Sequence, residues 1–183
     1  MPRIAILGGG LCGRLTALQL AEQGLSIALF DKGGRKGEHA AAYVAAAMLA
    51  PAAEAVEATP EVIKLGRQSI PLWRDIRGRL KTPTMMQENG SLIVWHGQDK
   101  PLSSEFVRHL KRGGVADDEI VRWRADDIAK REPQLGGRFS DGIYLPTEGQ
   151  LDGQQILSAL ADALDGMNVP CYWEHECAPE DLQ

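Results

Sequence analysis

The chain has little cysteine, no clustered positive charge and no long apolar run, and each of these absences excludes a class of protein. Only 3 cysteines occur in 183 residues. They form no Cys-x-x-Cys pair and have no histidines at zinc spacing, so neither a disulfide framework nor a zinc site is indicated. We therefore expect no bound metal and a location in the reducing cytoplasm.

Positive charge is scattered along the chain, since no run of Lys or Arg exceeds two residues and the net charge is -5. We therefore expect no nucleic-acid partner. The longest apolar run, residues 40–53, has 14 residues and contains a proline. A membrane-spanning helix needs about 20 apolar residues, so no membrane span is expected. With 44% hydrophobic and 25% charged residues, the composition is that of an ordinary globular protein.

A glycine-rich turn near the N-terminus is the most informative stretch. The apolar residues 4–7 run into Gly8, Gly10 and Gly13, spaced G-x-G-x-x-G, and residues 14–23 are compatible with a helix. In a dinucleotide-binding turn the first glycine permits the turn, the second lets a pyrophosphate approach the backbone, and the third lets the helix pack on the strand. Backbone N–H groups at the helix start then face the phosphates.

An acidic residue follows this turn at the distance that such a motif requires. Residues 25–30 are expected to form a second buried strand, and Asp31 stands at its end, 18 residues after Gly13. A carboxylate there can accept hydrogen bonds from a ribose. The alternative is a glycine-rich turn beside a solvated aspartate. The glycine motif alone does not choose between FAD and NAD, so an NAD-dependent dehydrogenase also stays open.

The rest of the pattern predicts an α/β fold with an inserted lobe. We expect helices at residues 40–50, 60–79, 102–111, 126–131 and 152–164, and strands at residues 84–87, 91–95, 139–145 and 168–173. Asn89-Gly90, between two of these strands, is typical of a β-hairpin. The last strand could return to the first sheet. The prediction is a Rossmann-like βαβ start in a part made of residues 1–80 and 150–183, interrupted by a mixed α/β lobe at residues 81–149.

Five motifs occur in an order that resembles one family. They are Gly8-Gly-Gly-Leu-Cys-Gly13, Ala45-Ala-Ala-Met-Leu-Ala-Pro51 with Glu54, Asn89-Gly-Ser-Leu92, Arg131-Glu-Pro133 and Tyr144-Leu-Pro-Thr-Glu-Gly-Gln-Leu-Asp152. Together they resemble the glycine oxidases, flavoproteins of the D-amino-acid-oxidase type, over nearly the whole chain. The resemblance implies an FAD-dependent oxidoreductase that deaminates a small amino acid or amine, with hydride transfer to the flavin. In organisms that use it for thiamine synthesis, such an enzyme supplies the iminoglycine of the thiazole ring.

The resemblance also implies which residues contact FAD. With the three glycines of the motif, the cofactor-binding set is Gly8, Gly10, Leu11, Cys12, Gly13, Asp31, Lys32, Ala41, Ala42, Ala46, Ala47, Met48 and Ala178. No catalytic acid, base or nucleophile is expected, which suits chemistry carried by the cofactor. This chain departs from the family where Ala41 and Ala42 replace Ser or Thr, and where Ala47 replaces Gly. The methyl group of Ala47 could crowd the flavin if that residue has a positive φ.

Members of the family are much longer than this chain, which corresponds to their N-terminal half. The residues that grip the substrate carboxylate would belong to the other half. A truncated, a split and a remnant enzyme are all compatible with the sequence, and so is a non-catalytic dinucleotide-binding fragment that needs a partner chain. Apolar surface that the other half would cover should promote a homo-oligomer or the binding of a complementing C-terminal chain.

Overall fold

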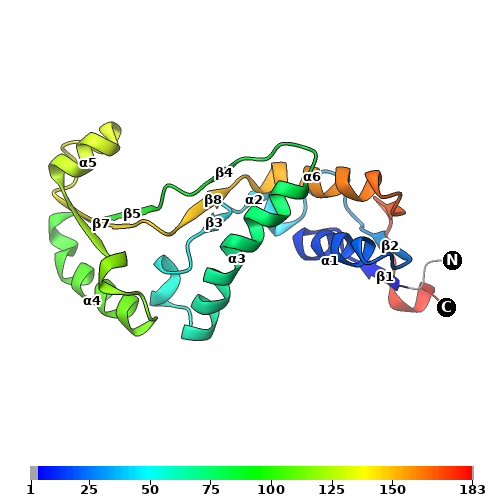
Figure 1. Ribbon diagram of the computed structural model, residues 1–183, viewed down its shortest axis with the longest axis horizontal. Coiled ribbons are helices and arrows are strands. Elements are labelled where there is room, and N and C mark those ends of the chain that lie inside the picture. The colour runs from blue at the N-terminus through cyan, green and yellow to red at the C-terminus, as the bar shows by residue number, and fades with distance from the viewer. Residues whose placement is uncertain (1–3, 183) are drawn as a thin grey trace. The chain divides into compact units, whose positions relative to one another are not determined.

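The computed structural model describes residues 4–182, which fall into two compact units (Figure 1). The first unit comprises Met1–Ala47, Arg74–Met86 and Leu151–Gln183, and the second comprises Met48–Trp73 and Gln87–Gln150. Residues 48–73, assigned to the first part from sequence, are grouped with the second unit. The roles of the two parts in binding FAD and substrate stay predictions.

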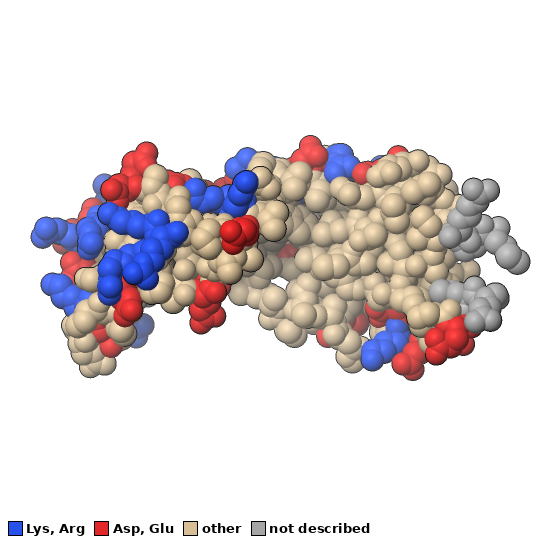
Figure 2. Space-filling view, turned by 90° about the horizontal axis from the view of Figure 1, so that it is seen from below, with Lys and Arg blue, Asp and Glu red and all other residues tan. Residues whose placement is uncertain are grey.

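The surface carries charges of both signs. On the face shown in Figure 2, acidic side chains lie beside the basic ones. Among the helices of residues 4–182, none combines the length and the hydrophobicity that crossing a membrane requires.

The first unit contains a parallel sheet in the order β1-β2-β9. Its strands are β1 (Ile4–Leu7), β2 (Ile27–Phe30) and β9 (Cys171–Tyr172). Ile4 lies opposite Ile27, and Leu29 lies opposite Cys171. The middle strand β2 is buried along most of its length, as its continuous apolar sequence predicts. The βαβ start and the return of the last strand to the first sheet are confirmed, although β9 is shorter than expected.

Two helices of the first unit pack against each other. Helix α1 (Leu11–Glu22) links β1 to β2 and packs against α6 (Gly153–Gly166). Asp152 caps α6, because its side chain accepts a hydrogen bond from the backbone N–H of Gln155 at 2.9 Å. The apolar face of α6 is buried, with Ile156, Leu157, Leu160 and Leu164 all at most 1% exposed. The amphipathic helix predicted for this segment is confirmed.

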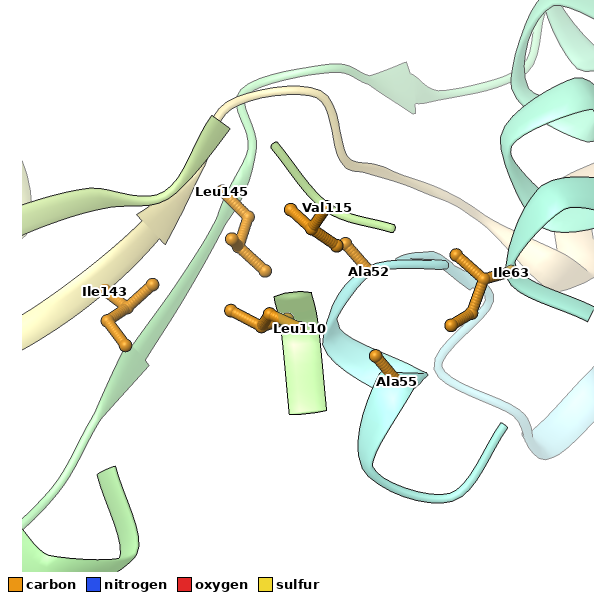
Figure 3. Packing of buried hydrophobic residues seen from close by; sticks show 7 residues of the cluster. All are labelled: Ala52, Ala55, Ile63, Leu110, Val115, Ile143 and Leu145. Atoms are coloured by element: carbon orange, nitrogen blue, oxygen red, sulfur yellow. The ribbon is translucent and has the colours of Figure 1, made fainter. Parts of the chain in front are cut away.

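The second unit is built on an antiparallel sheet in the order β5-β7-β6. Its strands are β5 (Ser91–Val94), β7 (Asp141–Leu145) and β6 (Val121–Arg124), and its helices include α4 (Lys100–Arg112) and α5 (Ala125–Arg131). Seven buried residues from the sheet, the helices and the loops form its core in Figure 3: Ala52, Ala55, Ile63, Leu110, Val115, Ile143 and Leu145. The sequence pattern did not predict β6.

The remaining elements are short, apart from one long helix. A small sheet has the order β3-β8-β4, formed by β3 (Met48–Leu49), β8 (Gly149–Leu151) and β4 (Met86–Gln87). Helix α3 (Pro60–Arg79) is continuous through Pro71. Helix α2 is Ala41–Val44, and 3₁₀ turns lie at Ala53–Val56, Gly97–Asp99, Asp117–Glu119, Pro133–Leu135 and Pro179–Leu182.

The predicted hairpin at Asn89-Gly90 is wrong. The strand before it, β4, belongs to the sheet of β8, whereas the strand after it, β5, pairs with β7. Gly90 does adopt a left-handed conformation, with φ 79°, but its N–H donates to the carbonyl of Glu148 at 2.9 Å. The glycine therefore marks the point where the chain passes from one sheet to another.

The helix predicted over residues 40–50 is also wrong beyond its first turn. Helix α2 ends at Val44, and Ala45 is extended, with φ -70° and ψ 147°. Ala47 is left-handed, and Met48 and Leu49 pair with β8. Alanine favours a helix locally, but strand pairing with a distant segment decides the conformation here.

Candidate functional site

The glycine turn has the backbone geometry that its spacing predicts. Gly8 has φ 103°, a conformation that favours glycine, and its N–H donates to the carbonyl of Phe30 at 2.8 Å. A Cβ atom on Gly13 would lie 1.8 Å from the carbonyl oxygen of Gly8. The start of α1 therefore packs directly on the turn, which only a glycine at position 13 allows.

Gly10 stands at the N-cap of α1 and leaves space beside the backbone. Its φ of -72° and ψ of -171° suit any residue, and no side chain caps the helix there. A Cβ atom on Gly10 would meet only the Cβ of Ala40, at 3.8 Å. The first N–H groups of α1, from Leu11 to Gly13, are thus available to an external acceptor. Open space and free donors at a helix start fit the pyrophosphate of a dinucleotide.

Asp31 lies against this turn. Its Oδ2 accepts a hydrogen bond from the N–H of Gly9 at 2.5 Å, and its Oδ1 accepts one from the N–H of Gly33 at 2.6 Å. The carboxylate thus joins the glycine turn to the loop after β2, a structural role that the sequence did not reveal. Each oxygen can accept a further hydrogen bond, so contact with a ribose stays a prediction. Lys32, next in the chain, is exposed.

The alanine-rich segment of residues 41–47 also belongs to the first unit. Ala41 and Ala42 lie in α2, and the carbonyl of Ala42 is so close to Gly153 that a Cβ there would lie 2.2 Å from it. Exposed Ala46 and half-buried Ala47 follow α2. The proposed contacts of these four alanines with the flavin stay predictions.

Two further residues of the expected set lie elsewhere. Met48, 57% exposed, opens β3 and belongs to the second unit. The backbone N–H of Ala178 donates to Oδ2 of Asp181 at 2.8 Å, beyond β9. The last residue of the expected set, Cys12, is exposed in the first turn of α1. All three cysteines are free. Within residues 4–182, no group of three or more His, Cys, Asp or Glu is placed to hold a metal ion.

Ala47 has φ 53°, a left-handed conformation that is unfavourable for a residue with a methyl group. A left-handed conformation costs a residue with a Cβ about 1–2 kcal/mol, and the greater backbone entropy of unfolded glycine offsets part of the gain from removing the Cβ. We therefore expect Ala47→Gly to raise the free energy of unfolding by about 0.5–1 kcal/mol.

Urea unfolding of the two chains measures this change, with Ala45→Gly as the matched control. Ala45 is extended at negative φ, so the same substitution there should destabilise the chain by about 0.5–1 kcal/mol. If both variants lost stability equally, Ala47 would carry no backbone strain.

The structure adds a residue that the sequence analysis missed, Arg14. Its side chain is 0% exposed, and the guanidinium lies 4.7 Å from the ring centroid of Trp173. Burial lowers the pKa of Arg14, while the charge of Asp31 acts in the opposite direction. Arg14 shares a helix face with the buried Leu18, four residues on, and this spacing was the one available signal.

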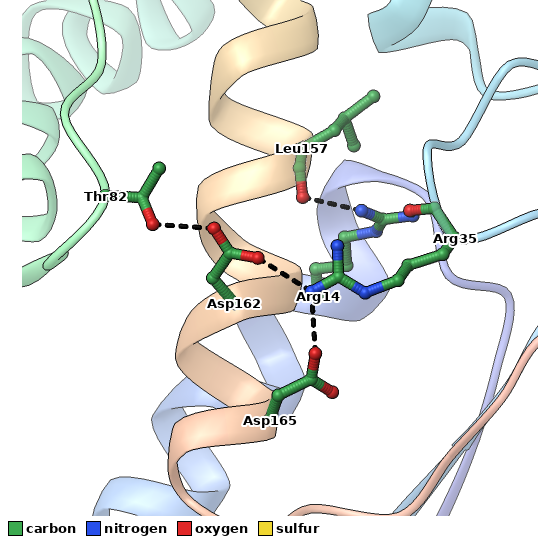
Figure 4. Close-up of polar contacts among 6 residues, drawn as sticks. All are labelled: Arg14, Arg35, Thr82, Leu157, Asp162 and Asp165. Atoms are coloured by element: carbon green, nitrogen blue, oxygen red, sulfur yellow. Dashed lines mark hydrogen bonds and ion pairs between the residues drawn. The ribbon is translucent and has the colours of Figure 1, made fainter.

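Ion pairs fasten the loop after β2 to α6. Arg35 contacts Asp162 at 2.7 Å and Asp165 at 2.6 Å, and Thr82 donates to Asp162 at 2.6 Å (Figure 4). The hydroxyl of Thr82, and then the charge-assisted bond from Arg35, lower the pKa of Asp162. Since Arg35 and Asp162 are each 41% exposed and Asp165 is 53% exposed, the pairs contribute little stability each but limit where the loop can lie.

The second unit contains a buried carboxyl, Glu148, which is 1% exposed. Its Oε1 accepts hydrogen bonds from the N–H groups of Ala52 and Ala53, both at 2.8 Å. Its Oε2 is buried without a hydrogen-bond partner among residues 4–182. Burial raises the pKa of Glu148, against the lowering effect of the two N–H groups and of the nearby Ser91 hydroxyl.

Comparison with known proteins identifies the family of this chain. The model of the FAD-dependent oxidoreductase family abbreviated DAO matches residues 3–178. A Rhizobium etli protein named as the thiamine biosynthesis oxidoreductase ThiO is 32% identical over 163 residues, which are 89% of this chain and 46% of that protein. A glycine oxidase of Geobacillus kaustophilus is 27% identical over 179 residues, covering 94% of this chain and 45% of the relative.

A solved structure shows the same fold. The crystal structure of glycine oxidase from Bacillus cereus superposes with a TM-score of 0.78 at 21% identity, over 95% of this chain and 46% of that one. The fold resembles the N-terminal part of glycine oxidase, as the sequence motifs predict. The chain spans about half the length of the curated relatives it matches. With a family match that covers almost all of its residues, the chain belongs to the DAO family of FAD-dependent oxidoreductases.

Proposed function

We propose that this chain binds the adenosine diphosphate part of FAD in an oxidase of the glycine-oxidase type. The observation that carries the proposal is the start of α1, where Gly10 leaves open space beside uncapped N–H groups and Asp31 lies against the turn. Gly10, Leu11 and Cys12 would bind the pyrophosphate through the backbone, and Asp31 the ribose. When bound, the flavin accepts hydride from the substrate, so the chain's own residues bind and orient rather than react.

The proposed substrate is a small amino acid or amine, whose oxidised imine hydrolyses to an oxo acid and ammonia. The names of the two curated relatives, a glycine oxidase and a thiamine biosynthesis oxidoreductase, support this class and a role in thiazole synthesis. Because the chain spans about half of those relatives, we propose turnover only together with the other half, in the same polypeptide or in a complementing one. A cytoplasmic location, inferred from the cysteine pattern, stays a prediction.

The test is the affinity of the chain for FAD and the effect of Gly10→Ala on it. The new methyl group would occupy the space that the pyrophosphate must enter, while contacting the chain only at an ordinary 3.8 Å. Losing one charge-assisted phosphate contact should raise the FAD dissociation constant about 10- to 150-fold. Titration followed by flavin fluorescence measures it, with ADP and NADH as competitors.

Gly78→Ala is the matched control, since Gly78 lies in α3 within the first unit and a Cβ there meets nothing within 4 Å. This variant should bind FAD as the unaltered chain does, and circular dichroism should show both variants folded. A chain that binds neither FAD nor ADP would overturn the proposal, and preferential binding of NADH would favour a dehydrogenase.

A further inference from the structure

The buried guanidinium of Arg14 joins three segments of the first unit. Its Nε donates to the carbonyl of Gly9 at 2.5 Å, Nη1 to the carbonyl of Leu157 at 2.5 Å, and Nη2 to the carbonyl of Arg35 at 2.8 Å. Figure 4 shows Arg14 reaching Leu157 on α6. Arg14 thereby connects the glycine turn, α6 and the loop after β2. The rigid fork of an arginine suits three separated acceptors, whereas the single ammonium of a lysine does not.

The hydrogen bond from Arg14 to the Gly9 carbonyl affects the candidate cofactor site directly. The N–H of Gly9 is held by Asp31, and its carbonyl is held by Arg14, so both sides of this residue are fixed. In a planar trans peptide, the C=O and the following N–H point in opposite directions. With the Gly9 carbonyl turned toward the buried guanidinium, the N–H of Gly10 must point away from it. That N–H adjoins the uncapped first turn of α1.

We propose that Arg14 is a positioning residue of the cofactor site, which holds the Gly9–Gly10 peptide so that the Gly10 N–H meets the cofactor pyrophosphate. The inference rests on the proposed function and extends it to a residue that makes no contact with the ligand. The bonds to Leu157 and Arg35 stabilise the fold. The bond to Gly9 fixes the orientation of the Gly9–Gly10 peptide, whose N–H would contact the phosphate.

The experiment compares Arg14→Lys and Arg14→Gln with Arg79→Gln. Lysine keeps the charge but not the fork, glutamine keeps neither, and Arg79→Gln removes a half-exposed cation of the same unit that pairs with Glu22. Dissociation constants for ADP and for adenosine, which lacks phosphate, are measured from the NMR signal of the Trp173 indole. Trp173 is the only tryptophan of the first unit within residues 4–182. In the ligand-free chain, the carbonyl chemical shift of Gly9 and the N–H shift of Gly10 report the peptide orientation.

We expect both Arg14 variants to weaken ADP binding about tenfold or more, with adenosine affinity changed less than about twofold. The Gly9 and Gly10 shifts should move in the same two variants, and Arg79→Gln should resemble the unaltered chain. An Arg14→Lys chain that binds ADP normally would overturn the inference, and so would equal losses for ADP and adenosine, which would show a general structural role. An unaltered chain that binds neither FAD nor ADP would instead overturn the proposed function, and this inference with it.

Discussion

Gly13→Ala is expected to disrupt the first unit, with a loss of about 3–5 kcal/mol in the free energy of unfolding. The added Cβ would lie 1.8 Å from the carbonyl oxygen of Gly8 and 3.0 Å from its carbonyl carbon. Neither atom can give way easily, because Gly8 is backbone in a tight turn whose N–H is bonded to Phe30. Helix α1 would have to move away from β1 and lose contact with β2 and α6. Domains are stable by only about 5–15 kcal/mol, so this loss removes much of the total.

Urea unfolding followed by circular dichroism measures the effect. Gly78→Ala provides the control, because the same methyl group in an open position of helix α3 should be neutral or stabilise by up to about 1 kcal/mol. Gly10→Ala separates folding from binding, since it should lower affinity for FAD while leaving the chain folded. A Gly13→Ala chain as stable as the control would show that α1 does not pack on the turn as described.

Glu148→Ala is expected to lower the free energy of unfolding by about 2–4 kcal/mol, because two backbone donors lose their acceptor. The N–H groups of Ala52 and Ala53 both bond to Oε1 of Glu148, beside the core of the second unit. Glu148→Gln keeps an acceptor oxygen at that place and replaces the buried Oε2 with an amide nitrogen. It should therefore retain most of the stability.

The difference in stability between the unaltered chain and Glu148→Gln should also depend on pH. Burial raises the pKa of Glu148 in the folded chain above its ordinary value of 4.5, so the folded state holds the proton more tightly than the unfolded state. The stabilisation that this provides is complete below pH 4.5 and is lost as pH rises through the folded-state pKa. The stability of the unaltered chain should thus fall, relative to Glu148→Gln, as pH rises from 4.5.

Unfolding at a series of pH values, with the exposed Glu57→Ala as control, tests both statements. The control should follow the unaltered chain at every pH. A difference between the unaltered chain and Glu148→Gln that grew in favour of the carboxyl with rising pH would mean that its pKa is lowered rather than raised.

Local patterns predicted the parts of the site that depend on neighbouring residues. The spacing of Gly8 and Gly13 reports a turn and a helix within ten residues, and Asp152 marks the start of α6 by its own hydrogen bond. Such features were correct because the atoms that determine them are close in the sequence. Asp31 was placed at the turn by the spacing of the motif, because Gly9 lies 22 positions before it, and its bonds to Gly9 and Gly33 were not foreseen.

Features that depend on distant segments were missed. Asn89-Gly90 has the composition of a hairpin, yet β5 pairs with β7, about fifty residues away. Arg14 looks like a surface residue of α1 until α6 is placed over it, since Leu157, one of its acceptors, lies 143 positions along the chain. The sequence does not distinguish Glu148 from the other acidic residues, because its two donors lie 95 and 96 positions away.

The interrupted arrangement of the first unit imposes an order on folding during synthesis. Strands β1 and β2 and helix α1 leave the ribosome early, but α6 and β9 come from residues beyond 150. Until then, the buried strand β2 lacks its second neighbour, and Arg14 lacks the carbonyl of Leu157. The residues of the second unit are all made in the interval, so that unit can fold while the first is incomplete. A nascent chain from which α6 and β9 have not yet emerged would therefore present an open parallel sheet to chaperones, and the emergence of β9 would close it.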